Sequence, residues 1–120
     1  MNLASYRFLV TGGAGFIGTN LVQRLVKEGA NVLVLDDLST GFINNVPSNV
    51  DFIEGDIADS KVWKSLPPVD YVYNLGAMVS VMESLENPLR CEQVNVHSVL
   101  HLLDYVRRHK VRKVVFASSA

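Results

Sequence analysis

The sequence predicts an α/β fold in which a doubly wound parallel sheet is covered by helices on both faces. Short runs of β-branched and apolar residues alternate along the chain with longer segments whose apolar residues recur at helical spacing. Each predicted strand is nearly uniformly apolar, as in a parallel sheet with both faces buried. Right-handed crossovers then favour five strands in the order 3-2-1-4-5, numbered along the chain. The 120 residues fit one domain, residues 1–120, because domains have about 150 residues.

The first predicted strand and helix flank a glycine-rich turn. Residues Arg7–Thr11 form a buried strand that stops at Gly12. From 16 to 28 the apolar residues recur at helical spacing, and Gly29 provides a C-terminal stop. A second strand is expected over 31–35, where Val and Leu alternate.

The middle of the chain predicts a loop, a strand and a short helix. Residues 38–49 hold Ser, Thr, Gly, Asn and Pro, a composition typical of a loop. A third short strand is expected over 50–54. The helix expected over 60–65 ends at Pro67-Pro68, because proline cannot continue a helix.

The last part of the chain predicts two more strands, over 71–75 and 113–117, and a long helix over 88–109. On this helix His97 and His101 are four residues apart, a spacing that would suit a metal pair. They continue into a polar stripe without a third ligand, so we expect a solvated face and no metal site. The expected apolar face consists of Val94, Val99, Leu102, Leu103 and Val106.

Composition excludes several classes of function. Eleven Lys and Arg against 12 Asp and Glu give a net charge of -1, which is too balanced for a protein that binds the nucleic-acid backbone. No apolar stretch approaches the length of a membrane span, and the N-terminus lacks a signal-peptide layout. The single cysteine, Cys91, cannot form an internal disulfide, so we expect a reducing, cytoplasmic location.

The glycines between the first strand and the first helix suggest a dinucleotide site. Gly13, Gly15 and Gly18 fit the pattern G-x-G-x-x-G, and Gly12 with the latter two fits G-x-x-G-x-x-G. Such glycines make the tight turn, let backbone N–H groups approach a pyrophosphate and let the helix pack on the strand. The helix N-terminus then holds the diphosphate. A plain strand–turn–helix also uses glycine, so the loop alone leaves both alternatives open.

An acidic residue at the end of the second strand favours the dinucleotide site. Asp36 lies 21 residues beyond Gly15, where a carboxylate accepts hydrogen bonds from the adenosine ribose hydroxyls. Because a carboxylate there repels a 2′-phosphate, and no Arg follows it, the sequence predicts NAD in preference to NADP.

Three motifs, Thr11–Gly18, Asp36–Gly41 and Glu54–Ile57, resemble the NAD-dependent sugar epimerase/dehydratase family, the extended branch of the short-chain dehydrogenase/reductases. The resemblance covers essentially the whole chain. It implies a Rossmann-type sheet, NAD as cofactor and a nucleotide sugar as substrate. Within the family the likeness is greatest to the N-terminal part of nucleotide-sugar 4-epimerases, which act by transient oxidation at the sugar C4.

The resemblance also implies roles for individual residues. Ser119 matches the catalytic serine that hydrogen-bonds the reacting sugar hydroxyl, and Asn95 matches an asparagine that braces the cofactor region. The implied cofactor-binding residues are Gly12, Gly15, Phe16, Ile17 and Gly18 at the pyrophosphate; Asp36, Asp37, Thr40 and Gly41 at the adenosine; Asp56 and Ile57 at the adenine; and Leu75, Gly76, Ala77 and Asn95 near the nicotinamide.

The chain departs from the family pattern at several positions. Asn74 stands where the family often has His, and Ser98-Val99 replace a common Gly-Thr. Val79 replaces a lysine that some 4-epimerases use to hold the cofactor, which weakens the assignment to that activity. Ala120 stands where dehydratases of the family carry an acidic residue. A methyl group transfers no protons, so dehydration is disfavoured.

The family's catalytic base, the tyrosine of a Tyr-x-x-x-Lys motif, does not occur among the 120 residues. None of Tyr6, Tyr71, Tyr73 and Tyr105 has Lys four residues on. We therefore expect the chain to be the N-terminal cofactor-binding portion of a longer enzyme, inactive alone, with its sheet ending before the later strands and the substrate domain.

Two further points are left open. The function could instead be that of a non-catalytic NAD-binding module for sensing or interaction, or of a decarboxylase, reductase or dehydratase of the same family; Ser119 favours an enzyme. Met78, Val81 and Met82 could line a substrate pocket, pack in the core or form a loop.

The last strand, 113–117, is expected to be an apolar edge that promotes self-association or a homo-oligomer.

Overall fold

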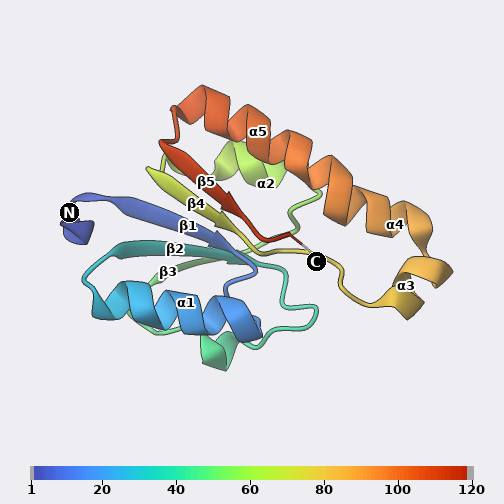
Figure 1. Ribbon diagram of the computed structural model, residues 1–120, viewed down its shortest axis with the longest axis horizontal. Coiled ribbons are helices and arrows are strands. Elements are labelled where there is room, and N and C mark those ends of the chain that lie inside the picture. The colour runs from blue at the N-terminus through green and yellow to red at the C-terminus, as the bar shows by residue number, and fades with distance from the viewer. Residues whose placement is uncertain (1, 119–120) are drawn as a thin grey trace.

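The computed structural model describes residues 2–118 and contains the predicted parallel sheet in the order β3-β2-β1-β4-β5. Every neighbouring pair of strands is parallel, and Figure 1 shows the strands side by side. Each strand agrees with its predicted range to within one residue. The strands are β1 (Arg7–Thr11), β2 (Asn31–Asp36), β3 (Asp51–Glu54), β4 (Tyr71–Asn74) and β5 (Lys113–Phe116).

Helices cover both faces of the sheet (Figure 1). The main helices are α1 (Phe16–Lys27) on one face, and α2 (Ser60–Ser65) and α5 (Ser98–His109) on the other. The predicted long helix is α4 (Pro88–Glu92) joined to α5 by a π-helical turn, η3 (Gln93–His97). Within residues 2–118, no helix is long and apolar enough to cross a membrane.

Three short helices were not predicted. The turns η1 (Leu3–Ser5) and η2 (Ile43–Asn45) are single 3-10 turns, and α3 (Val81–Glu86) follows β4. Ser80 caps α3, because its hydroxyl accepts a hydrogen bond from the Glu83 N–H. Val81 and Met82 are exposed on this helix, whereas Met78 packs against the core.

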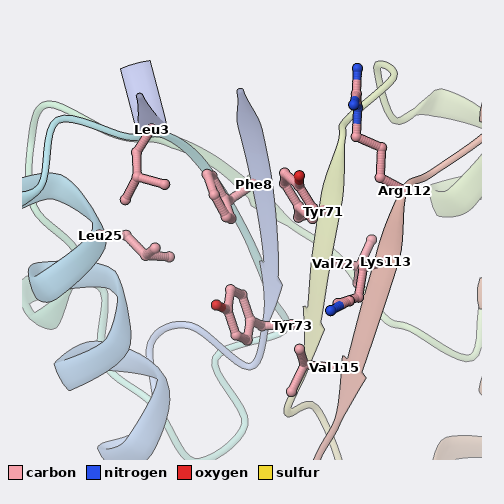
Figure 2. A pocket seen from close by; sticks show the side chains of 9 residues that line it. All are labelled: Leu3, Phe8, Leu25, Tyr71, Val72, Tyr73, Arg112, Lys113 and Val115. Carbon is pink, nitrogen blue, oxygen red and sulfur yellow. The ribbon is translucent and has the colours of Figure 1, made fainter. Parts of the chain in front are cut away.

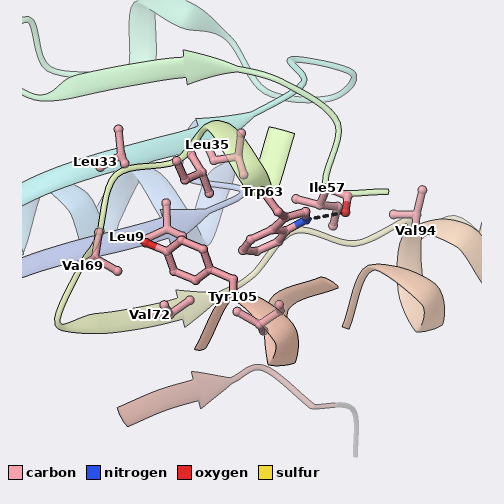
Figure 3. Close-up of a cluster of buried hydrophobic side chains, with 11 residues drawn as sticks. Leu9, Leu33, Leu35, Ile57, Trp63, Val69, Val72, Val94 and Tyr105 are labelled. Atoms are coloured by element: carbon pink, nitrogen blue, oxygen red, sulfur yellow. Dashed lines mark hydrogen bonds between the residues drawn. The ribbon is translucent and has the colours of Figure 1, made fainter. Parts of the chain in front are cut away.

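The first core lies between the sheet and the helices α2 and α5. Figure 3 shows Trp63 and Tyr105 packed against Leu9 and Val72, with the two ring centroids 5.7 Å apart. The Trp63 Nε1–H donates to the Ile57 carbonyl at 2.7 Å, and the Tyr105 hydroxyl donates to the Pro67 carbonyl. Both aromatic side chains therefore bury their rings and still satisfy their polar atoms.

The buried face of the long helix differs in part from the predicted apolar face. Val94 and Leu102 are buried as predicted, but Leu103 is 54% exposed, and Tyr105 takes the central position in the core. The buried face of the helix is set by Val94, Ser98, Leu102 and Tyr105. The π-helical turn adds one residue to a turn and so shifts the register of the residues before it.

The second core lies between α1 and the opposite face of the sheet, and it covers only part of that face. Val22 and Leu25 pack on Phe8, Val10 and the central part of β2. Beyond them, Tyr71, Tyr73 and Val115 line an open groove of about 450 Å³ (Figure 2). Tyr71 and Tyr73 stack on Phe8, with ring centroids 5.1 and 6.2 Å away.

Candidate cofactor-binding site

The predicted site residues gather at the carboxyl edge of the sheet. The loops that follow β1, β2 and β4 leave the sheet at this edge, next to the N-terminal end of α1 (Figure 1). In the strand order, β2 and β3 are added on one side of β1, and β4 and β5 on the other, so the order of winding reverses between β1 and β4. Such a switch point is where open α/β sheets bind ligands.

The glycine-rich turn brings backbone against backbone. Gly12 has φ +71°, a conformation that favours glycine, and its N–H donates to the Leu35 carbonyl at 2.8 Å. A Cβ on Gly12 would lie 2.9 Å from the Gly76 nitrogen, and one on Gly18 would lie 2.1 Å from the Gly12 carbonyl oxygen. These glycines therefore seat α1 directly on the ends of β1 and β4.

The N-terminus of α1 is suited to hold an anion. Gly15 is the N-cap, and its own N–H donates to the Gly12 carbonyl at 3.2 Å. Phe16, Ile17 and Gly18 form the first turn of α1. The backbone N–H groups of a first turn have no acceptor within the helix. No acidic residue lies in that turn, and the 86% exposed Phe16 side chain leaves the backbone approachable. This arrangement fits the pyrophosphate of a dinucleotide.

Asp36 ends β2 and ties the glycine-rich turn to the next loop. Its carboxylate accepts the Ala14 N–H at 3.0 Å through Oδ2 and the Leu38 N–H at 2.8 Å through Oδ1. The residue is 8% exposed. Each carboxylate oxygen can accept a further hydrogen bond, so the geometry leaves acceptor positions for ribose hydroxyls.

The other predicted adenosine residues occupy the loop after β2. Asp37 and Thr40 are exposed, and the Asp37 carboxylate accepts the Ser39 N–H at 3.0 Å. Gly41 is buried, and a Cβ there would lie 2.6 Å from the Ala14 carbonyl oxygen. Because Gly41 has no side chain, the loop can pack closely against the glycine-rich turn.

The predicted adenine residues lie after β3. The Asp56 carboxylate accepts the Ala58 N–H at 2.9 Å and forms an ion pair with Arg90 of α4 at 2.7 Å. Ile57 is buried in the first core. Sequence reasoning missed Arg90, because 34 residues separate it from Asp56 and no local pattern marks the pair.

The segment after β4 is held by side chains from other elements. The Thr11 hydroxyl donates to Asn74 Oδ1 at 2.7 Å and accepts the Leu75 and Gly76 N–H groups, both at 3.1 Å. Thr11 and Asn74 are both buried. This hydroxyl joins the end of β1 to the predicted nicotinamide side of the site, where Ala77 is exposed.

Asn95 contacts the same segment from the π-helical turn. Its Oδ1 accepts the Met78 N–H at 2.8 Å, and its Nδ2 donates to the Met78 carbonyl at 2.9 Å. The side chain therefore pairs with both backbone groups of one residue. The sequence pointed to Asn95 as a site residue, but it did not show that Met78 is its hydrogen-bond partner.

The remaining residues singled out in the sequence are Ser119, Tyr105 and the histidines His97 and His101. Ser119 and Ala120 lie outside the described residues. Burial raises the pKa of Tyr105 to about 12, so it is unsuited to act as a base near neutral pH. The rings of His97 and His101 meet edge to face, with their centroids 4.9 Å apart. Residues 2–118 contain no group of three His, Cys, Asp or Glu side chains that could hold a metal ion.

Comparison with known proteins points to one family. A model of the NAD dependent epimerase/dehydratase family matches residues 8–120. The chain is 40% identical over 120 residues to a UDP-glucose 4-epimerase of Streptomyces lividans, and 41% identical over 118 residues to one of Lactobacillus helveticus. These alignments cover 97% and 95% of the chain but only 36% of each relative. The chain thus spans little more than a third of these relatives.

Solved structures show the same fold. A UDP-glucose 4-epimerase of Thermotoga maritima, solved with UDP-glucose, has a TM-score of 0.90 and 38% identity. A UDP-glucose 4-epimerase of Thermus thermophilus, solved with NAD, has a TM-score of 0.85 and 41% identity. The matches cover 94% of this chain in both cases, and 38% and 37% of those chains.

Proposed function

The chain belongs to the NAD dependent epimerase/dehydratase family, and we propose that it binds NAD as the cofactor-binding part of a nucleotide-sugar 4-epimerase. The observation that carries the proposal is the junction of the glycine-rich turn with Asp36. The turn offers the free N–H groups at the start of α1, and Asp36 holds the turn through Ala14 while keeping acceptor positions free.

Each part of NAD has residues suited to hold it. The pyrophosphate would lie against the N–H groups of Phe16, Ile17 and Gly18, and the adenosine ribose against Asp36. Asp37, Thr40 and Gly41 lie on the adenosine side, Asp56 and Ile57 at the adenine, and Leu75, Gly76, Ala77 and Asn95 beside the nicotinamide ribose. Bound NAD supplies reversible removal of a hydride from the sugar, while the residues of this chain bind and orient it.

NAD titration tests the cofactor. We expect saturable NAD binding, competition by ADP-ribose, and at least tenfold weaker binding of NADP, because the Asp36 carboxylate repels a 2′-phosphate. Absence of NAD binding at millimolar concentration would contradict the proposal.

A nucleotide sugar is the proposed substrate, since the relatives include an epimerase solved with UDP-glucose. Ser119 is proposed to hydrogen-bond the reacting hydroxyl. The 120 residues contain no Tyr-x-x-x-Lys pair, so we expect them to bind NAD but not to convert UDP-galactose. Measured turnover of UDP-galactose by this chain would show that the base lies within it.

We also propose self-association through β5. This strand is at the edge of the described sheet, and its Val115 and Phe116 side chains are exposed. Apolar edge strands favour pairing with another chain. Light scattering should show a mass that rises with concentration; a monomer at high concentration would contradict it.

A further inference from the structure

The loop between β2 and β3 carries three of the proposed adenosine contacts but little regular structure. Asp37, Thr40 and Gly41 lie in it, and its single helical turn is η2 (Ile43–Asn45). A loop that must be ordered on binding costs affinity, whereas a loop already held in its bound conformation does not. What fastens this loop to the rest of the site therefore affects how tightly NAD binds.

The loop is fastened at one residue of the glycine-rich turn. Ala14 is fully buried, and its N–H donates to Asp36. Its carbonyl accepts two hydrogen bonds from the loop, from the Phe42 N–H at 3.3 Å and from the Asn45 Nδ2 at 3.2 Å. The Asn45 N–H donates to the Phe42 carbonyl at 2.9 Å, so η2 directs both donors to the same oxygen.

Close packing beside these hydrogen bonds leaves no space between loop and turn. The room for a Cβ at Gly41 is taken by the Ala14 carbonyl oxygen, 2.6 Å away. Figure 1 shows the loop passing beside the N-terminal end of α1, where the pyrophosphate would bind. The two loop residues that donate to the Ala14 carbonyl differ in kind: Phe42 uses its backbone N–H, whereas Asn45 uses its side-chain amide.

We infer that Asn45 is a positioning residue of the NAD site: its side-chain amide fastens the β2–β3 loop to Ala14 and sets the spacing between the adenosine contacts and the pyrophosphate turn. The inference rests on the proposed function. Asn45 itself touches none of the proposed cofactor positions and acts through Ala14 and Phe42. The contact joins residues 31 apart in sequence.

Three variants of the 120-residue chain test this role. Asn45→Ala removes the donor, and we expect NAD affinity to fall about fivefold, the effect of one net hydrogen bond. Asn45→Asp keeps the shape but places a carboxylate oxygen against the Ala14 carbonyl, so the loss should be larger, at least tenfold. Asn44→Ala is the matched control, because Asn44 lies on the same turn, is exposed and has no side-chain hydrogen bond among those of the described residues. It should stay within twofold.

Three further measurements distinguish positioning from a general loss of structure. Affinity for AMP should fall with that for NAD, whereas the urea midpoint should move little, because Asn45 is exposed. In the unmodified chain, NAD should slow hydrogen exchange at the Phe42 amide. Equal NAD affinity in the unmodified chain and Asn45→Asp, or unchanged Phe42 exchange, would overturn the inference. No NAD binding by the unmodified chain would overturn the proposed function instead.

Discussion

The two halves of the candidate site are held in different ways. At the glycine-rich half, backbone touches backbone, and a Cβ on Gly18 would lie 2.1 Å from the Gly12 carbonyl oxygen. At the β4 half, single polar side chains hold the backbone: Thr11 binds Leu75 and Gly76, and Asn95 binds Met78. Close backbone packing at glycines therefore shapes the first half, in addition to the hydrogen bonds of Asp36 and Asn45 to Ala14. The second half depends mainly on matched side-chain donors and acceptors.

The largest effect is expected from Gly18→Ala, which adds one carbon at the tightest contact of the glycine-rich half. Because the obstructing atoms are backbone, α1 must move away from β1. We expect NAD affinity to fall at least 100-fold and the free energy of unfolding to fall by about 3 kcal/mol. NAD titration and urea denaturation measure the two effects.

Gly29→Ala is the matched control for that variant. Gly29 has φ +84°, but no atom lies within 4 Å of its would-be Cβ. We expect a loss of about 1 kcal/mol from backbone strain and unchanged NAD affinity. If Gly18→Ala bound NAD as well as Gly29→Ala does, close backbone packing would not be what shapes this half.

Thr11→Val tests the β4 half with a side chain of similar shape. It removes the hydroxyl and leaves Asn74 Oδ1 and the Gly76 N–H without this partner, whereas the Leu75 N–H keeps its hydrogen bond to the Thr11 carbonyl. Unsatisfied buried groups cost about 2 kcal/mol here, and urea denaturation should show this loss. Thr11→Ser keeps the hydroxyl and should recover most of the difference. Equal stability of the Val and Ser variants would mean that the hydroxyl does not hold this half.

Asn95→Asp is expected to have a smaller effect because its contact is only partly buried. The substitution exchanges the donor to the Met78 carbonyl for a second acceptor and leaves the Met78 N–H bonded. We expect a loss of about 1 kcal/mol in stability and a fall of a few fold in NAD affinity. Hydrogen exchange at Met78 should stay slow, and rapid exchange there would contradict the remaining bond.

The same difference explains how much could be predicted from sequence. The glycine-rich half could be predicted because the glycine spacing and Asp36 at a strand end are local signals. The strands could be predicted because each is a short apolar run. The hydrogen bonds of Thr11 with the β4 segment, the Asp56–Arg90 pair and the Asn45–Ala14 contact join residues 31 to 65 positions apart. No periodicity marks such contacts. The helix α3 was missed because it has only six residues, too few for a helical repeat of apolar residues to be recognised.

Tyr105→Phe, remote from both halves, should have the smallest effect and give the baseline for the comparison. It removes one hydrogen bond to the Pro67 carbonyl, worth about 1 kcal/mol, and keeps the ring packed on Trp63. NAD affinity should not change. Burial raises the pKa of Tyr105 to about 12 from 10, so its contribution to stability is present below pH 10 and is lost as the pH rises from 10 through 12. Urea midpoints across that range should fall more steeply for the unmodified chain than for Tyr105→Phe. Parallel curves would mean that the buried hydroxyl ionises as readily in the folded chain as in the unfolded one.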